Sequence, residues 1–204
     1  MSREQQTAAF DLNKFSHLTQ YQARPGEIGC TLSHQKCYRL LMESSEKSAI
    51  IFEDDLIVNE PIQDIIPLVK KWLDCDEPRV VLLSGWFWFT SSSDFDSKHK
   101  ISRVSDAYGT YAYALNRVAA KVMLDSKPWY LADDWCMFKK RGVRIFGICP
   151  HLCDSDLGEK FKTTLNIGMR IHAPFNINAV LLNKYRSLIK RILFLFGKFE
   201  KAVK

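Results

Sequence analysis

Residues 48–58 read Ser-Ala-Ile-Ile-Phe-Glu-Asp-Asp-Leu-Ile-Val, an apolar run that ends in three acids. The run Ala49–Phe52 contains no polar residue, which is typical of a strand buried on both faces of a parallel sheet. Ligands of open α/β sheets bind beyond the carboxyl ends of the strands. The stretch therefore predicts a strand covered on both faces, with a binding site at its carboxyl end.

Helical and extended patterns alternate on either side of this strand. Residues 86–100 combine an aromatic cluster with a Ser-rich run and are expected to form a mobile surface loop. The alternation predicts an α/β domain with a mostly parallel sheet flanked by helices. One helix is expected over Gly29–Lys47, and a second begins at Pro61, with a kink or late start at Pro67. Two further helices are expected to follow N-terminal caps, one at Asn116 and one at Asp133 or Asp134. The expected strands are Arg79–Gly85, Tyr108–Leu115 and Val143–Ile148.

The composition fits one globular domain followed by a basic tail. The chain has 204 residues, 47% of them hydrophobic and 25% charged, with a net charge of +6. Residues 183–204 hold seven basic residues and one acid, so residues 1–182 are neutral overall. A nucleic-acid-binding domain should carry its own basic surface, which argues against that class of partner. We therefore divide the chain into a domain over 1–182 and a tail over 183–204.

The tail is expected to form an amphipathic basic helix. Apolar and aromatic residues alternate there with Lys and Arg, the pattern of a helix that lies in a membrane interface against anionic lipid heads. The alternative is a terminal helix that docks on the domain with its charges solvated. The beginning of the chain lacks the apolar run of a secretory signal, which predicts a cytoplasmic protein. The six cysteines form no Cys-x-x-Cys pair, so reduced thiols are expected.

The acids Glu53, Asp54 and Asp55 carry the most chemical content. Side chains two apart on a strand point the same way, so Glu53 and Asp55 can face one ligand together. Hard oxygen ligands in this arrangement suit Mg²⁺ or Mn²⁺, with a diphosphate completing the coordination. A solvated acidic turn or a helix cap is an equally good interpretation of these residues taken alone.

A second acidic pair, Asp133 and Asp134, precedes Trp135 at an expected helix start. Helix capping explains one of these acids but not both. A general base beside an aromatic residue that stacks on a sugar ring would explain the pair, with Asp134 the first choice and Asp133 the second.

Two glycines, Gly26 and Gly29, lie ahead of the first expected helix. They suggest that a ligand closely approaches the backbone at the N-terminus of that helix. His34 follows them, and a structural, hydrogen-bonded histidine is the simpler explanation for that residue.

Three motifs of the chain resemble glycosyltransferase family 25, which contains bacterial lipopolysaccharide and lipooligosaccharide glycosyltransferases and the collagen galactosyltransferases. The motifs are Gly26-Glu-Ile-Gly-Cys-Thr-Leu-Ser-His34, Ile50-Ile-Phe-Glu-Asp-Asp55 and Tyr108-Gly-Thr-Tyr-Ala-Tyr113. Their order and spacing are similar to the family over about residues 22–160.

The resemblance implies a GT-A type α/β fold and inverting transfer of a sugar, commonly galactose, from a UDP-sugar to a lipid-linked oligosaccharide. It places the metal, Mn²⁺ or Mg²⁺, on Asp55 and Glu53. A divalent ion lowers the charge of the leaving diphosphate, and a carboxylate, Asp134 or Asp133, removes the acceptor proton. Donor binding is assigned to Gly26, Gly29, His34, Glu53, Asp54 and Gly109. A lipid-linked acceptor places the enzyme at the inner face of the cell membrane, as a peripheral protein.

The beginning of the chain differs from the family. Members begin with an apolar strand, which here is shortened or lost. The main alternative function is therefore a catalytically degenerate relative that binds a membrane or a partner. A metal-dependent phosphoryl-transfer enzyme or nuclease is disfavoured, because no glycine loop with Lys follows a strand and the domain has no basic excess.

Overall fold

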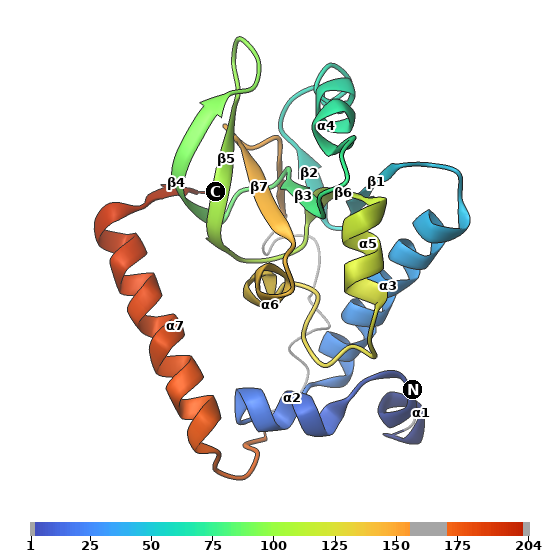
Figure 1. The fold of residues 1–204 in the computed structure, drawn as a ribbon, viewed down its shortest axis with the longest axis vertical. Coiled ribbons are helices and arrows are strands. Elements are labelled where there is room, and N and C mark those ends of the chain that lie inside the picture. The colour runs from blue at the N-terminus through green and yellow to red at the C-terminus, as the bar shows by residue number, and fades with distance from the viewer. Residues whose placement is uncertain (1–2, 156–170, 202–204) are drawn as a thin grey trace.

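The computed structural model describes residues 3–155 and 171–201 of the chain. Its centre is a seven-stranded sheet with the order β1-β6-β3-β7-β5-β4-β9 (Figure 1). Its strands are β1 (Ser48–Phe52), β3 (Arg79–Leu82), β4 (Phe87–Asp94), β5 (Lys100–Ala107), β6 (Ala112–Asn116), β7 (Arg144–Cys149) and β9 (Lys198–Glu200). A separate antiparallel pair is formed by β2 (Leu56–Val58) and β8 (Cys153–Ser155).

Helices pack against both faces of the large sheet, which confirms the predicted α/β class. One apolar cluster joins α3, α5 and α6 to one face, and a second joins α4 to the other. The described helices are α1 (Arg3–Ala9), α2 (Leu12–Thr19), α3 (Pro25–Glu43), α4 (Ile66–Leu73), α5 (Arg117–Leu124), α6 (Trp135–Lys140) and α7 (Ile177–Phe196). None of these helices is long and apolar enough to cross a membrane.

The prediction of a mostly parallel sheet is wrong, because β3 and β7 form the one parallel pair among neighbours in the described sheet. The strand β6 lies between β1 and β3 and runs antiparallel to both. The strands β1, β3 and β7 nevertheless point the same way. The carboxyl ends of these three strands therefore lie at the same end of the sheet, and the acids that follow β1 lie there too.

The strand β1 forms as predicted, but it is not buried on both faces. It is the edge strand of the sheet, and among the described strands it pairs with β6 alone. Ile51 is buried, whereas Phe52 is 44% exposed. An apolar run of this length indicates a strand but does not distinguish the middle of a sheet from its edge.

The expected surface loop over residues 86–100 is wrong, because β4 and β5 form an antiparallel hairpin there. Phe87 and Phe89 are buried on the core side, and the ring of Trp88 lies 4.5 Å from that of Phe199 in β9. Alternation of side chains across a strand explains this division. The Ser-rich part belongs to the exposed end of the same strand, so its polarity reflects solvent exposure and not a loop.

The helix α3 begins earlier than expected and ends at Glu43. Pro25 occupies its first turn, and the backbone N–H of Arg24 donates to Oε2 of Glu27 at 2.8 Å. Gly26 and Gly29 therefore lie inside the helix and not ahead of it, which corrects the expected boundary. Two other predicted boundaries are confirmed: α4 starts late, with Pro67 in its first turn, and Asn116 caps α5 by accepting from the Ala119 N–H at 2.9 Å.

Both ends of the described chain pack on this core. Residues 3–19 form α1 and α2, and no strand occurs in that stretch. The helix α7 starts before the expected tail and runs along one side of the molecule (Figure 1). After Gly197 the chain turns, and β9 joins the edge strand β4.

Candidate active site

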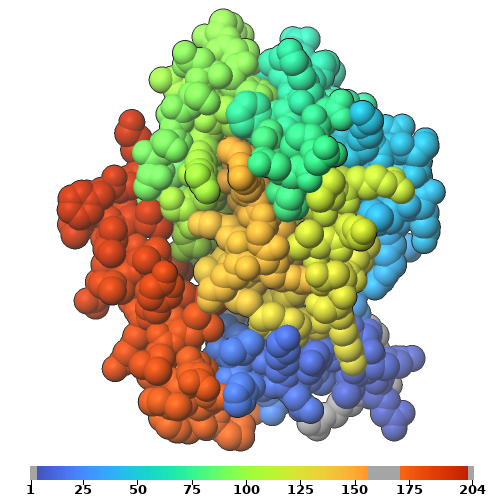
Figure 2. All heavy atoms as spheres, in the orientation of Figure 1, coloured from blue at the N-terminus to red at the C-terminus, as the bar shows by residue number. Residues whose placement is uncertain are grey.

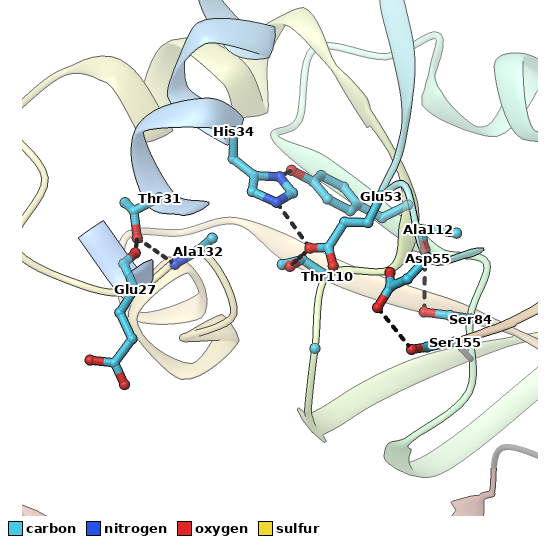
Figure 3. Close-up of polar contacts among 12 residues, drawn as sticks. Glu27, Thr31, His34, Glu53, Asp55, Ser84, Thr110, Ala112, Ala132 and Ser155 are labelled. Carbon is cyan, nitrogen blue, oxygen red and sulfur yellow. Dashed lines mark hydrogen bonds and ion pairs between the residues drawn. The ribbon is translucent and has the colours of Figure 1, made fainter. Parts of the chain in front are cut away.

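The helix α3 presents a row of buried polar side chains to the carboxyl end of β1. Thr31, His34 and Tyr38 lie on one face because they are three and four residues apart. Oγ1 of Thr31 donates to the Glu27 carbonyl at 2.9 Å and accepts from the Ala132 N–H at 3.1 Å (Figure 3). The helix therefore also fixes the segment that leads into Asp133.

His34 connects Glu53 to two buried tyrosines. Its Nε2 lies 3.1 Å from Oε1 of Glu53, and its Nδ1 lies 2.7 Å from the hydroxyl of Tyr113 (Figure 3). The Tyr38 hydroxyl is 2.8 Å from that of Tyr113. A carboxylate only accepts, so Nε2–H donates to Glu53, and in this tautomer Nδ1 is assigned as the acceptor of the Tyr113 hydroxyl. With this assignment Tyr38 donates to Tyr113.

Glu53 is also held by the turn that precedes β6. Oγ1 of Thr110 donates a short hydrogen bond to the same Oε1 that His34 contacts, and the Glu53 N–H donates to the Tyr111 carbonyl at 2.9 Å. Desolvation raises the pKa of Glu53, but the hydrogen bonds from His34 and Thr110 outweigh it and leave the pKa below its ordinary value. Glu53 is therefore an ionised carboxylate held through one oxygen.

Asp55 lies beside Glu53 and is only partly satisfied. Oγ of Ser155 donates to its Oδ2 at 3.3 Å (Figure 3). Its Oδ1 is buried and has no hydrogen-bond partner in the part of the chain that the structure describes. Desolvation and the charge of Glu53 raise the pKa of Asp55. Asp54, between them, is exposed. A buried carboxylate oxygen without a donor, next to a second carboxylate, fits a cation.

A second set of possible metal ligands overlaps the first. Ligand atoms of Cys30, His34 and Glu53 all lie within 4.8 Å of one another. Desolvation, with the charges of Glu53 and Asp133, raises the pKa of the Cys30 thiol to about 12. A protonated thiol is a poor ligand, and both ring nitrogens of His34 are already hydrogen-bonded. The pair Glu53 and Asp55 is therefore the better candidate.

The second acidic pair lies at the start of α6. Asp134 caps this helix by accepting from the Met137 N–H at 3.3 Å, and its two oxygens lie 3.2 and 3.3 Å from Nη2 of Arg186 in α7. Asp133 is exposed. Its pKa is nevertheless raised, first by desolvation and then by the charges of Asp134, Glu27 and Glu53. The predicted cap is confirmed, and it occupies Asp134 and not Asp133.

A cavity of about 710 Å³ lies between α6 and α7. Asp133, Asp134 and Trp135 line it, whereas Glu53 and Asp55 do not. The turn before β6 joins the two acidic groups, because Trp135 Nε1 donates to the Gly109 carbonyl at 2.9 Å and Thr110 donates to Glu53. The structure therefore brings both predicted clusters to one region, with the second facing the cavity.

The predicted glycines have different surroundings. At Gly29 a Cβ would meet nothing within 4 Å, so the helix would tolerate a side chain there. Gly109 has a φ of +72°, and a Cβ there would collide with the Tyr111 ring. Gly109 is thus required by the turn that holds Thr110, whatever else it contacts.

Sequence reasoning missed several contributors to this region, namely Thr110, Tyr113, Ser155 and Arg186. Tyr113 could have been found, because Thr31, His34 and Tyr38 form a polar row at helical spacing that needs a buried polar partner. Nothing in the sequence pairs Asp134 with Arg186, since 52 residues separate them.

Comparisons with known proteins agree with this architecture. The family model described as "Glycosyltransferase family 25 (LPS biosynthesis protein)" matches residues 2–137. The chain is 23% identical over 149 residues to "Lacto-N-neotetraose biosynthesis glycosyltransferase LgtE" of Neisseria meningitidis serogroup B, covering 64% of this chain and 53% of that protein. It is 24% identical over 186 residues to a Haemophilus influenzae protein named "Putative glycosyltransferase", covering 85% of this chain and 66% of that protein.

The chain thus spans between about half and two thirds of the length of these curated relatives. The family match includes α3 with His34, the acids after β1, the turn at Gly109 and the pair before α6. It covers about two thirds of the chain. This chain belongs to glycosyltransferase family 25.

Proposed function

We propose that this chain transfers a sugar, galactose in the first instance, from a UDP-sugar to a lipooligosaccharide or lipopolysaccharide acceptor. Family membership and the named relatives support sugar transfer as the reaction class. The observation that carries the proposal is the pair Glu53 and Asp55 at the carboxyl end of β1, with Oδ1 of Asp55 buried and without a donor among the described residues.

The metal of this proposal is Mn²⁺ or Mg²⁺, held by Glu53 and Asp55. His34 and Thr110 both donate to Oε1 of Glu53, so Oε2 is the oxygen left to meet a cation. A divalent ion supplies a Lewis acid that lowers the negative charge of the departing diphosphate. The two tyrosines behind His34 stiffen the carboxylate, which keeps it from reorganising when the charge of the diphosphate develops.

The proton of the acceptor hydroxyl needs a carboxylate on the cavity side. The sequence favours Asp134 over Asp133, but the contacts of the two side chains reverse this order. Asp134 already caps α6 and pairs with Arg186. The pKa of Asp133 is raised, which brings that carboxylate closer to the basicity that proton removal requires. We therefore assign Asp133 as the general base of an inverting transfer, with the charge of Asp134 raising its basicity.

A lipid-linked acceptor defines where such an enzyme works. We place it in the cytoplasm as a peripheral protein on the inner face of the cell membrane, with residues 183–204 as the segment that meets the anionic surface. Gly26, Gly29 and Asp54, expected to bind the donor, lie at the start of α3 and beside Asp55. Their contact with a UDP-sugar remains a prediction.

A panel of UDP-sugars tests the proposal directly. The purified full chain should hydrolyse or transfer one of them with Mn²⁺ present, and EDTA should abolish the reaction. Asp55→Asn should reduce turnover at least about 1,000-fold. The control Asp64→Asn removes an exposed acid outside the site and should not change turnover.

Two outcomes count against the proposal. Turnover that survives both EDTA and Asp55→Asn would reject the metal role of this pair. A chain that binds no UDP-sugar in the presence of Mn²⁺ would favour the catalytically degenerate relative.

A further inference from the structure

The helix α7 docks on the domain through a side that carries both cations and buried apolar residues. Arg186 pairs with Asp134 at 3.2 Å, and Nζ of Lys190 lies 3.7 Å from Asp106 and 4.6 Å from the centre of the Tyr108 ring. Ala179 and Leu193 are the buried residues of this helix, and they lie on the same side. Two of the helix's four cations are thus neutralised by acids of the domain.

The opposite side of α7 is apolar and exposed. Its residues follow one another at spacings of four and three, so they form a single stripe along the helix. The members of this outer stripe are Leu181, Tyr185, Leu188, Ile192 and Leu195, which are between 44% and 72% exposed. An amphipathic helix of a soluble domain normally turns its apolar stripe inward. This helix has a second apolar stripe that faces outward in addition to the buried Ala179 and Leu193, which marks the outer stripe as a surface for a partner (Figure 2 shows α7 along one edge of the molecule).

The charges beside the stripe identify the partner. Residues 177–196 contain four cations and no acid. Lys184 and Arg191 flank the stripe, are exposed, and have no ion pair with any residue in the described ranges. An anionic surface complements this arrangement. A second copy of the helix would instead bring like charges together, which disfavours a dimer through this face.

We propose that the outer stripe of α7 lies in the interface of an anionic lipid bilayer, with Lys184 and Arg191 on the lipid headgroups, while Arg186 and Lys190 face the acids of the domain. This deepens the membrane partner in the proposed function, but it does not depend on sugar transfer. Tyr185 and Ile192 belong to the stripe and also line the cavity that contains Asp133. The cavity therefore opens beside the bilayer, where a lipid-linked acceptor would arrive.

Two double variants separate the faces of the helix. The outer-pair variant carries Lys184→Gln and Arg191→Gln. The inner-pair variant carries Arg186→Gln and Lys190→Gln. Each variant removes two positive charges from the same helix. The measurement is sedimentation of the full chain with vesicles of phosphatidylcholine alone or with phosphatidylglycerol added. The outer pair should weaken binding to the anionic vesicles about 30-fold. The inner pair should weaken it less than about threefold.

A second comparison tests the apolar stripe. Leu188 in α7 and Leu40 in α3 are both 55% exposed, so a Ser at either position removes the same exposed side chain. Leu188→Ser should weaken vesicle binding about tenfold or more, because buried methylene groups are lost from the bilayer. Leu40→Ser should leave it unchanged. Circular dichroism checks that every variant is folded.

Three results would overturn the inference. The first is equal loss of vesicle binding in the outer-pair and inner-pair variants, which indicates attraction by net charge alone. The second is no binding of the wild-type chain to anionic vesicles at low salt. The third is a dimer that Leu188→Ser disrupts in the absence of vesicle binding, which assigns the stripe to a second copy. Loss of sugar transfer with intact vesicle binding would instead count only against the proposed function.

Discussion

Glu53 and Asp55 receive hydrogen bonds from an imidazole and from hydroxyls, whereas Asp134 caps a helix and pairs with a cation, Arg186. The first pair has carboxylate oxygens left for an ion, and the second pair faces a cavity. Two clusters of carboxylates thus have different surroundings. The difference teaches that the contacts of a carboxylate, more than its presence in a motif, show which task to propose for it, here a metal site for the first pair and proton removal for the second.

The largest effect should separate the two members of the second pair. Asp133→Asn should reduce transfer about 100- to 10,000-fold, because the proposed general base is lost, while binding of UDP with Mn²⁺ stays unchanged. Asp134→Asn should reduce transfer only about tenfold, because Asn keeps the helix cap and only the charge that raises the basicity of Asp133 is removed. Single-turnover kinetics and UDP titrations measure both.

The opposite ranking of these two variants would return the base to Asp134. A loss of UDP binding in Asp133→Asn would place Asp133 in the donor site instead, and the two clusters would then share one task.

The next largest effect is expected from breaking the hydrogen-bond chain that runs from Glu53 through His34 to Tyr113. Tyr113→Phe leaves Nδ1 of the buried His34 without its donor and should cost about 1–3 kcal/mol of unfolding free energy, measured by urea denaturation. Mn²⁺ affinity should fall severalfold with it. The control Tyr130→Phe removes another buried hydroxyl, which bonds the Met123 carbonyl away from the site. It should lower stability to a similar extent but leave Mn²⁺ affinity unchanged, and equal Mn²⁺ affinities in the two variants would refute a positioning role for His34.

Stability should depend on pH in opposite ways for the two clusters. The pKa of Glu53 is lowered in the folded state, so its contribution is present above the unfolded Glu pKa and is lost as pH falls through the folded value. The pKa of Asp133 is raised, so its ionisation destabilises the fold as pH rises above the unfolded Asp pKa.

Thermal unfolding of two variants tests this contrast. Glu53→Gln should lose about 1.5–3 kcal/mol at pH 7, and Asp133→Asn should gain stability there. The gain of Asp133→Asn should vanish below about pH 4, where the unfolded Asp is itself protonated. A gain that persists at pH 3 would show that ionisation is not its cause.

The smallest effect is expected for Arg186→Gln. The ion pair with Asp134 is partly exposed, so its loss should change the unfolding free energy by about 0–1 kcal/mol. Thermal unfolding measures it. A loss above about 2 kcal/mol would mean that this pair, and not the apolar contacts of Leu193, holds α7 on the domain.

Much of this arrangement could be predicted from local sequence. The strand before Glu53, the Asn116 cap and the cap at the Asp133–Asp134 pair all depend on neighbouring residues, and the structure has all three. The directions of the strands could not be predicted, because the antiparallel insertion of β6 is decided by long-range pairing. Residues 86–100 were expected to be a loop because of their polar, Ser-rich run, but that run is the exposed end of β4 in a hairpin with β5.

The carboxylates of the site could be predicted from the sequence, but the residues that surround them could not. Glu53 and Asp55 stand out because acids that follow an apolar run need a partner. The donors to Glu53 come from α3 and from the turn before β6, and only the fold brings them together. The orientation of α7 was equally hidden, since its sequence does not say which of its cations find acids on the domain.

The measurement that tests this account most directly is a calorimetric titration of UDP into the full chain with Mn²⁺ present, repeated with Asp55→Asn. We predict saturable binding that needs Mn²⁺ and is weakened at least about tenfold by the substitution, since a carboxylate ligand is removed. Binding of equal strength in the two proteins, or binding that is indifferent to Mn²⁺, would contradict a metal site on Glu53 and Asp55.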